Sequence, residues 1–360
     1  MSAVASVTPK YRPLKFGVTR ITLRDGAPGV EYVQADLSLQ PYAARITDRF
    51  VHWARTAPER SFMARRQQLP DGRTGGWQHL SYARALQAAR SIAQALLNRG
   101  LSAERPVAIL SENRTAAGVG VRVCSCGVVR CARWSPAPTI GGQGDDKPTR
   151  VPATRRPGLV FATAASRYGE AIAATVDANS EVVIASPPHT SLGPRATTEF
   201  AALIHTPATS AADAAMQATG PDTIVKFLFT SGSTKLPKAV INTQRMWCAN
   251  QQQMAQSMPV LAEEQLVLVD WLPWNHTFGG NHNFGMVLYH GGTLYIDDGK
   301  PTPALMRETL RNLREIAPTV YFNVPTGFEA IAHAMKTDDQ LRRTLLSRVR
   351  MFFYAGAALA

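Results

Sequence analysis

Short apolar runs alternate along the chain with stretches of helical periodicity, and this alternation predicts an α/β fold. The clearest example starts at Ser81, a suitable helix N-cap, and continues through an amphipathic helix over residues 82–99 to Gly100. The apolar strand Val107–Leu110 follows after a short loop. A helix, a glycine, a short loop and a buried strand in this order are typical of parallel strands covered by helices.

The same patterns predict further elements on both sides of this unit. Helices are expected over residues 46–56, 167–176 and 244–258, after Thr302, and after Thr326 as a cap. Strands are expected within residues 157–162, 181–184, 224–229, 239–241, 266–270, 291–296, 318–325 and 351–358. We divide the chain into a lead-in segment (1–45), a first α/β subdomain (46–185), a connecting segment (186–221) and a second α/β subdomain (222–360).

Residues 114–156 interrupt these patterns. They contain six glycines and four prolines and show no sustained helical or strand period, so we expect them to pack poorly. Two explanations stay open. One is translation out of frame through two compensating shifts, which would produce a sequence rich in Arg, Gly, Ala, Pro and Cys, and the other is a natural basic insertion. Resequencing the gene separates them, because an open frame through this region would remove the first explanation.

The formal charge of +13 at pH 7 raises the alternative of a basic nucleic-acid-binding protein. The distribution of charge argues against it, because residues 114–156 hold seven Arg and one Lys against two Asp and alone carry +6. Cys124, Cys126 and Cys131 lie in the same segment. Their spacing is not the paired spacing of structural zinc modules, so no metal site is predicted.

No apolar run is long enough to span a bilayer, and the first residues lack the apolar core of a secretory signal. We therefore expect a cytoplasmic protein with neither a membrane nor a nucleic acid as its partner.

A hydroxyl-rich turn lies between two strand-like runs in residues 224–243. The turn, Thr230-Ser231-Gly232-Ser233-Thr234, is followed by Lys235, Pro237 and Lys238. Its backbone N–H groups, hydroxyls and two ammonium groups have the chemistry to hold a polyphosphate. A P-loop does not fit, because that motif needs a helix directly after its lysine and Pro237 prevents one here. A phosphate clamp between two strands and an ordinary turn remain.

A second polar cluster follows the apolar run 266–270, where residues 270–285 have the sequence DWLPWNHTFGGNHNFG. A single histidine after a strand is most often a satisfied polar group. The imidazole of His276 could instead hydrogen-bond a carboxylate or phosphate oxygen, while the aromatic side chains around it border an apolar cavity.

Residues 230–238 resemble the phosphate-binding signature of the adenylate-forming superfamily, which includes acyl-CoA synthetases, luciferases and peptide-synthetase adenylation domains. Lys235 and Ala239 stand where that family usually has glycines, which reach positive φ at little cost. The family motif Leu-Pro-x-x-His-x-x-Gly is matched by Leu272, Pro273, His276 and Gly279. Residues 318–325 resemble a further element of the family, Pro-Thr-x-x-x-x-Val-Pro. Residues 226–243 and 270–285 are most similar to those of feruloyl-CoA synthetases.

This resemblance implies the large N-terminal domain of an adenylate-forming enzyme, with mostly parallel sheets flanked by helices in two subdomains. It implies an acid–CoA ligase that uses ATP, Mg²⁺ and coenzyme A to activate an aromatic carboxylate. The nucleotide-binding residues that it implies are Thr230, Ser231, Gly232, Ser233, Thr234, Lys235, Lys238, Gly356, Ala357 and Ala358. The implied catalytic residues are His276 and Lys238, and the implied substrate-binding residues are Trp274, His276, Phe278 and His282.

Members of that family continue with a Thr-Glu motif, a ribose-binding aspartate, a hinge and a small C-terminal domain with a catalytic lysine. Only four residues follow Gly356. We therefore expect an incomplete large domain without the C-terminal domain and with little or no ligase activity alone, which robust pyrophosphate exchange with ATP and ferulate would contradict. The alternatives are a non-catalytic nucleotide-binding fragment, which would bind ATP without exchange, and a nucleic-acid-binding protein, whose affinity would fall steeply with salt.

Overall fold

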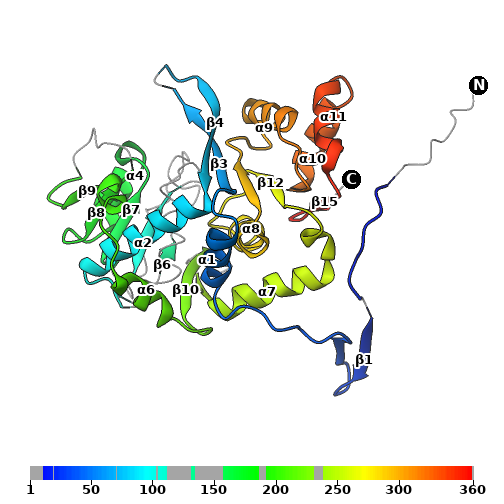
Figure 1. The fold of residues 1–360 in the computed structure, drawn as a ribbon, viewed down its shortest axis with the longest axis horizontal. Helices are drawn as coiled ribbons and strands as arrows, with labels where there is room; N and C mark the ends of the chain where they lie inside the picture. The colour runs from blue at the N-terminus through cyan, green and yellow to red at the C-terminus, as the bar shows by residue number, and fades with distance from the viewer. Residues whose placement is uncertain are drawn as a thin grey trace, which may run out of the picture.

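The computed structural model describes residues 11–18, 20–69, 71–102, 104–111, 131–133, 157–185, 192–230 and 238–358, with the backbone alone at 131–133, 229–230 and 238. Within these residues the strands form one sheet of seven, one of four and two of two (Figure 1). Helices cover the two larger sheets. This arrangement of mostly parallel strands and helices confirms the predicted α/β class.

The seven-stranded sheet has the order β11-β10-β6-β5-β7-β8-β9. All of its neighbouring strands are parallel except β10 and β11, which form an antiparallel hairpin at one edge. Its central strands are apolar and buried on both faces, as expected where helices cover a parallel sheet. The strands are β5 (Val107–Leu110), β6 (Cys131–Arg133), β7 (Leu159–Ala162), β8 (Glu181–Ile184), β9 (Thr197–Glu199), β10 (Ile224–Thr230) and β11 (Lys238–Thr243).

The four-stranded sheet has the order β12-β13-β3-β4, with β4 antiparallel at one edge and the other strands parallel. Beside it lies the parallel pair β14 and β15, which contacts the sheet through β12. The hairpin of β1 and β2 projects away from the body of the molecule (Figure 1). The bounds are β1 (Ile21–Asp25), β2 (Glu31–Ala35), β3 (Ser61–Gln68), β4 (Thr74–Ser81), β12 (Val267–Asp270), β13 (Thr293–Ile296), β14 (Val320–Asn323) and β15 (Met351–Tyr354).

The described α-helices are α1 (Ile46–Thr56), α2 (Tyr82–Asn98), α4 (Ala165–Thr175), α5 (Phe200–Ile204), α6 (Ser210–Gln217), α7 (Gln244–Ser257), α8 (Phe284–His290), α9 (Pro303–Glu315), α10 (Pro325–Ala334) and α11 (Asp339–Arg348). A 3₁₀ turn, η1 (Pro259–Ala262), follows α7, and a π-helical turn, η2 (Phe278–Asn283), leads directly into α8. Helices α1 and α2 pack on each other, and α8 packs on α1. Tyr82 links α2 to the end of α8, because its buried hydroxyl donates to the carbonyl oxygens of Val287 (3.1 Å) and Gly292 (2.9 Å).

Predictions from local signals agree with these elements. Helix α1 and strands β5 and β8 have their predicted bounds, and α2 is capped by the Ser81 hydroxyl, which accepts from the N–H of Arg84. Gly100, after α2, has φ +61°, a conformation that favours glycine. Thr326 as a helix cap is wrong: the N-cap of α10 is Val324, and Pro325 occupies the first helical position, where proline is favoured.

Residues 114–156, which have no sustained period in the sequence, contain one strand within their described part. The backbone of Cys131–Arg133 forms β6, which pairs in parallel with β5 and with β10. Three residues are too few to produce a recognisable period in the sequence. The rest of residues 114–156 lies outside the described part of the chain, as do the side chains of the three clustered cysteines.

Strand pairing crosses the predicted subdomain boundaries in both directions. Strands β10 and β11, from residues 222–360, complete the sheet built by β5, β7 and β8. Strands β3 and β4, from residues 46–185, join β12 and β13. The connecting segment 186–221 contributes β9, α5 and α6. The two larger sheets are therefore each assembled from distant parts of the sequence.

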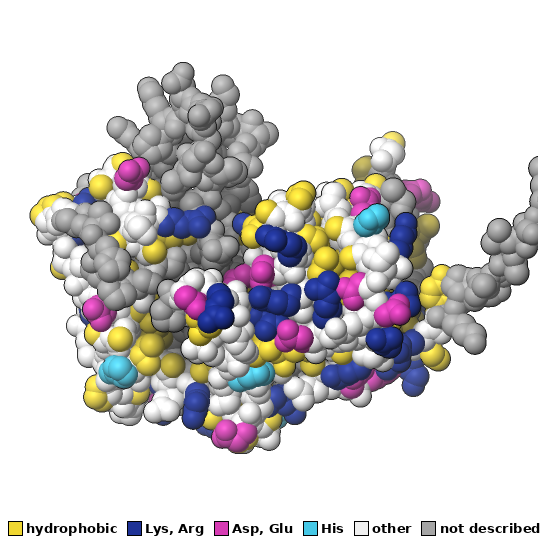
Figure 2. Space-filling model, turned by 90° about the horizontal axis from the view of Figure 1, so that it is seen from above, with side chains coloured by type: hydrophobic (Ala, Val, Ile, Leu, Met, Phe, Trp, Pro, Cys, Tyr) yellow, Lys and Arg dark blue, Asp and Glu magenta, His cyan; other side chains and the backbone are white. Residues whose placement is uncertain are grey.

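Basic side chains on the face shown in Figure 2 alternate with acidic ones. Several arginines of the described chain are held in ion pairs, among them Arg66 with Glu315 (2.7 Å) and Arg348 with Glu264 (2.8 Å). Each pair removes a positive charge from the field that a polyanion would meet.

Candidate active site

The segment that carries His276 leaves the carboxyl end of β12 and turns back on itself. The N–H of His276 donates to the Pro273 carbonyl oxygen (3.0 Å), and the His276 carbonyl oxygen accepts from Gly280 (2.8 Å). The chain then forms the π-helical turn η2, a conformation that is frequent at functional sites. His276 therefore lies at the start of a short, wide helical turn with its side chain exposed.

Two glycines make this turn possible. A Cβ atom at Gly279 would lie 2.5 Å from the Leu272 carbonyl oxygen, and one at Gly280 would lie 2.0 Å from the Trp274 carbonyl oxygen. Both distances are shorter than real Cβ contacts. The Gly279-Gly280 pair thus lets η2 pack directly against the preceding backbone.

The hairpin that frames the predicted phosphate loop is hydrogen-bonded to η2. Lys226 on β10 reaches the Gly280 carbonyl oxygen with its Nζ (3.4 Å), and Asn242 on β11 accepts from the Asn281 amide (2.7 Å). Lys226 and Asn242 stand opposite each other in the antiparallel register. One cross-strand residue pair, Lys226 and Asn242, therefore contacts the π-helical turn from both strands of the hairpin.

The loop itself closes the same hairpin. Thr230 and Lys238 form the last backbone pair, four positions beyond Lys226 and Asn242. At about 3.4 Å per residue, the loop begins about 14 Å from the contact with η2. Ser231, Gly232, Ser233, Thr234 and Lys235 lie outside the described residues, as do the side chains of Thr230 and Lys238.

Helix α7 braces this contact from the other side. The Trp247 indole N–H and the Gln251 side-chain amide both donate to the Asn281 carbonyl oxygen, each at 2.9 Å. The Lys226 ammonium lies 3.6 Å from the centre of the Trp247 ring. Trp247 is buried, and its N–H and its ring fix η2 and β10.

Phe278 and His282, two of the predicted substrate-binding residues, come together in an aromatic cluster. Their rings are 5.6 Å apart, and each also meets two rings that the sequence analysis did not assign to the site, Phe322 on β14 and Phe353 on β15. Phe322 is buried, whereas the other three rings are partly exposed. We call these four residues the aromatic cluster.

Trp274 is placed differently from the other predicted substrate-binding residues. Its side chain is 1% exposed and packs 5.3 Å from the Phe284 ring in the main core. It lies behind the site rather than in the aromatic cluster.

The carboxyl ends of three parallel strands converge beside the aromatic cluster. Strand β12 ends at Asp270, β14 at Asn323 and β15 at Tyr354. The indole N–H of Trp271 donates to the Asn323 side-chain oxygen (3.1 Å) and so joins the first two ends. Ligands of open α/β sheets bind at this edge of the strands.

The predicted adenine-binding residues Gly356, Ala357 and Ala358 follow β15 after Ala355. All three are exposed, and Gly356 has φ +99°, which a residue with a side chain rarely adopts. A Cβ at Gly356 would meet nothing within 4 Å. These three residues are therefore exposed beyond the carboxyl end of β15.

Asp270 and His282 are buried titratable groups beside this edge. Burial raises the pKa of the Asp270 carboxyl to about 7; the Leu272 N–H and the Asn283 amide offset part of this rise, and Asp297 adds to it. Burial also lowers the pKa of His282, which its contact with Asn283 partly opposes. An imidazole with a lowered pKa is neutral at physiological pH.

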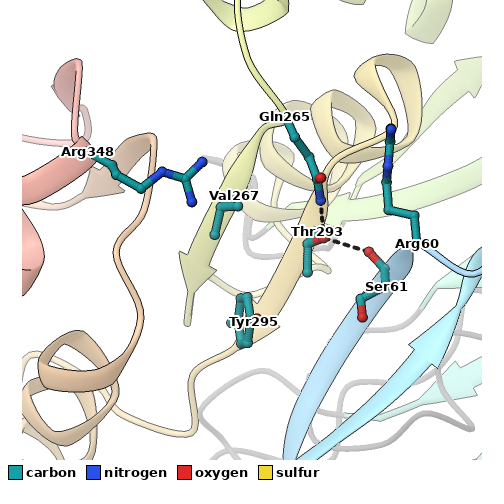
Figure 3. A pocket seen from close by; sticks show the side chains of 7 residues that line it. All are labelled: Arg60, Ser61, Gln265, Val267, Thr293, Tyr295 and Arg348. Carbon is teal, nitrogen blue, oxygen red and sulfur yellow. Dashed lines mark hydrogen bonds between the residues drawn. The ribbon is translucent and has the colours of Figure 1, made fainter. Parts of the chain in front are cut away.

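A cavity of about 390 Å³ is lined by Arg60, Ser61, Gln265, Val267, Thr293, Tyr295 and Arg348 (Figure 3). Its lining includes Ser61, Val267 and Thr293, the first residues of β3, β12 and β13. It therefore lies toward the amino ends of those parallel strands, opposite the edge that carries the candidate site. None of the predicted site residues lines it.

The family of the chain follows from residues 153–360, more than half of its length, which match the protein family described as AMP-binding enzyme. The chain belongs to this family. The resemblance to adenylate-forming enzymes, first drawn from the loop and the His276 motif, is confirmed at this level.

Solved structures with the same fold include VinN in complex with L-aspartate, with a TM-score of 0.62 and 17% identity over 90% of this chain and 72% of VinN. The fatty acyl-adenylate ligase from L. pneumophila, in complex with acyl adenylate and pyrophosphate, has a TM-score of 0.63 and 16% identity over 88% of this chain and 50% of that one. The adenylation domain of a carboxylate reductase from Mycobacterium chelonae has a TM-score of 0.63 and 17% identity, over 88% and 54% respectively. These likenesses confirm the predicted adenylation-domain fold.

One curated relative, chalcone synthase cfoA of Aspergillus candidus, is 28% identical over 131 residues. The match covers 36% of this chain and 4% of that much longer protein.

Of the residues that the structure describes, none belongs to a helix both long and apolar enough to cross a bilayer.

Proposed function

We propose that the chain carries the carboxylate-activating site of an acid–CoA ligase similar to the feruloyl-CoA synthetases. In the first step a carboxylate oxygen attacks the α-phosphorus of ATP, the bond to pyrophosphate breaks, and an acyl adenylate forms. In the second step the thiol sulfur of coenzyme A attacks the acyl carbon, AMP leaves, the thiol proton passes to solvent, and a carbon–sulfur bond forms. Such chemistry depends mainly on positioning and electrostatic stabilisation.

The observation that carries the proposal is the hydrogen-bonded link between the phosphate-loop hairpin and η2. Lys226 and Asn242, on the two strands that frame the loop, hold Gly280 and Asn281. A segment bearing His276 is thereby tied to the hairpin whose loop matches a triphosphate-binding signature. An acyl-adenylate-forming site needs these two features on one rigid frame, because the carboxylate must meet the α-phosphate in line.

The nucleotide is assigned to groups on both sides of this frame. We propose that residues 230–235 and Lys238 hold the phosphates and that Gly356, Ala357 and Ala358 border the adenine. Mg²⁺ neutralises phosphate charge when it is bound. Among the described residues, no three His, Cys, Asp or Glu side chains form a group that could hold a metal ion, so we assign Mg²⁺ no protein ligand.

The acid is assigned to the side of the aromatic cluster. We propose that His276 hydrogen-bonds the carboxylate and that Phe278 and His282 contact an aromatic ring of the acid. Trp274, buried against Phe284, supports this wall from behind. Aromatic rings stabilise one another edge to face at centroid distances of the kind that the cluster already shows, so an aryl acid suits this wall.

Calorimetric binding to the 360-residue chain tests the proposal. The ligands are ATP and two stable acyl-adenylate mimics, feruloyl- and acetyl-sulfamoyl adenosine. We expect the feruloyl mimic to bind more tightly than either ATP or the acetyl mimic, because it fills the nucleotide and aryl positions together. Failure of all three ligands to bind would overturn the proposed function.

Pyrophosphate exchange with ATP and ferulate is the companion measurement. It separates binding from turnover: mimic binding with little exchange fits the expected low activity of these residues alone, and robust exchange would contradict that expectation.

Because both co-substrates, ATP and coenzyme A, are supplied in the cytoplasm, we propose that the enzyme works there.

A further inference from the structure

His282 is held by a buried neighbour on only one side of its ring. Its Nδ1 lies 2.8 Å from the Asn283 side-chain oxygen, and Asn283 itself is 0% exposed. The other ring nitrogen, Nε2, has no hydrogen-bond partner among the described residues. The ring packs beside both Phe322 and Phe353, 5.1 and 5.6 Å from their centres, and those two rings also meet each other.

Asn283 is held in turn by Asp270, the last residue of β12. Asp270 is 2% exposed, and its Oδ1 accepts from the Leu272 N–H (3.0 Å). Its Oδ2 and the Asn283 Nδ2 have no standard hydrogen-bond partner within the described chain. The Asn283 amide nevertheless acts on the Asp270 carboxyl by side-chain hydrogen bonding. The two buried groups therefore interact, and this interaction lowers the pKa of the Asp270 carboxyl.

The hydrogen-bonding chemistry of Asp270, Asn283 and His282 determines which way the Asn283 amide is oriented. Above its pKa of about 7 the Asp270 carboxyl is ionised and only accepts hydrogen bonds, so there Asn283 turns its NH₂ toward Asp270. The Asn283 oxygen then faces His282 and can only accept, so Nδ1 must carry the proton. In a neutral imidazole the remaining nitrogen, Nε2, is then an acceptor.

We propose that Asp270 and Asn283 are positioning residues that fix His282 in this form, so that its Nε2 accepts a hydrogen bond from a hydroxyl group on the ring of the acid. The proposal rests on the proposed function and names what one wall of the acyl site recognises. A lone pair repels carboxylate and phosphate oxygens, so His282 takes a different task from His276. The lowered pKa of His282, caused by burial, agrees with a neutral ring.

The tautomer is measurable without any ligand. Long-range ¹H–¹⁵N correlation spectra of chain labelled at its eight histidines distinguish a protonated Nδ1 from a protonated Nε2. At pH 8.5, where Asp270 is ionised, we expect His282 to carry its proton on Nδ1. In Asp270→Asn the second amide can donate as well as accept, so we expect a mixture of tautomers. A His282 with its proton on Nε2 in the unchanged protein would overturn the inference.

The recognition is tested with three mimics of the acyl adenylate: the sulfamoyl adenosines of 4-hydroxycinnamate, 4-methoxycinnamate and cinnamate. The unchanged chain should prefer the hydroxyl over the methoxy compound roughly tenfold, the effect of one hydrogen bond. His282→Phe should lose this preference and keep its affinity for the cinnamate compound. His333→Phe, on the exposed surface of α10, should leave all three affinities unchanged and serves as the matched control.

These outcomes separate the two proposals. A preference that survives His282→Phe, or an equal loss for all three mimics, overturns the role of His282 while the proposed function stands. Failure of every mimic to bind the unchanged chain overturns the proposed function, and the recognition by His282 with it.

Discussion

The Lys226 ammonium lies 3.6 Å from the centre of the Trp247 ring, and both residues are buried. A buried ammonium is costly unless other groups replace its hydration. The ring face and the Gly280 carbonyl oxygen, 3.4 Å from Nζ, supply part of that replacement. The contact joins β10, α7 and η2 at one point, directly behind the candidate site.

A double-mutant cycle measures this contact. Lys226→Met alone removes both a favourable interaction and a desolvated charge, so its effect on the free energy of unfolding is small. Trp247→Leu alone leaves the charge without its ring and costs several kcal/mol, about the range for large core truncations. We expect a coupling of about 1 to 2 kcal/mol between the two changes in urea denaturation.

The same cycle with Lys300→Met in place of Lys226→Met provides the control, because Lys300 is exposed. That pair should be additive. Additivity of Lys226→Met and Trp247→Leu within the error of the measurement would show that the ammonium gains nothing from the ring.

Gly280 is expected to be intolerant of any side chain. In Gly280→Ala the new Cβ would lie 2.0 Å from the Trp274 carbonyl oxygen, a backbone atom that cannot move alone. The turn η2 must then shift, and we expect the free energy of unfolding to fall by more than about 2 kcal/mol.

Gly76→Ala on the edge strand β4 is the matched change. A Cβ there meets nothing within 4 Å, so its effect should stay within about 1 kcal/mol. Equal melting temperatures for the two variants would contradict the close packing of η2 on the segment before it.

Local signals in the sequence were enough to predict much of the fold and part of the candidate site. The cap at Ser81 and the apolar runs of β5 and β8 act over a few residues, and these elements form as predicted. The aromatic cluster could not be predicted in the same way. Phe322 and Phe353 meet His282 only because β14 and β15 are parallel and end beside η2.

Two other features of the site could not be predicted from the sequence, for physical reasons. The π-helical turn depends on the close approach of Gly280 to the Trp274 backbone, which no pattern of apolar residues records. The cross-strand pair that contacts η2 depends on the antiparallel register that places Lys226 opposite Asn242. A buried lysine and asparagine within strands are the one local sign of it, since strands buried on both faces are normally apolar.

Asp270 should make the stability of the chain depend on pH. Its pKa is raised by burial to about 7, so between the unfolded value of 3.8 and 7 the folded state holds a proton that the unfolded state has lost. The contribution of Asp270 to stability is therefore largest at acid pH and falls as the pH rises through this window. The slope is at most about 1.4 kcal/mol per pH unit.

Asp270→Asn removes this titration. From pH 5 to pH 8, the free energy of unfolding of the unchanged chain should therefore fall relative to that of the variant. The groups that act on Asp270 are Leu272, Asn283 and Asp297, and all of them stay in the variant. Asp25→Asn on the exposed β1 strand should show no such trend, and a flat difference for Asp270→Asn would contradict its burial as a titrating group.

Phe353 and Phe352 stand next to each other on β15 and point to opposite faces, so they offer a matched test of the aromatic cluster. Phe353 lies 5.6 Å from His282, whereas Phe352 packs 5.8 Å from Phe328 on α10. If the cluster binds the ring of the acid, Phe353→Leu should weaken feruloyl-sulfamoyl adenosine about fivefold more than octanoyl-sulfamoyl adenosine, because leucine keeps apolar area but loses the ring–ring contact.

Phe352→Leu removes the same number of atoms from the same strand and should leave the ratio of the two affinities unchanged. Calorimetry with both ligands gives the ratio directly, so a general loss of folded protein cancels out. The same shift in ratio for both variants would place the acyl group elsewhere. An unchanged ratio for Phe353→Leu would mean that the cluster packs the parallel strand ends together without contacting the acid.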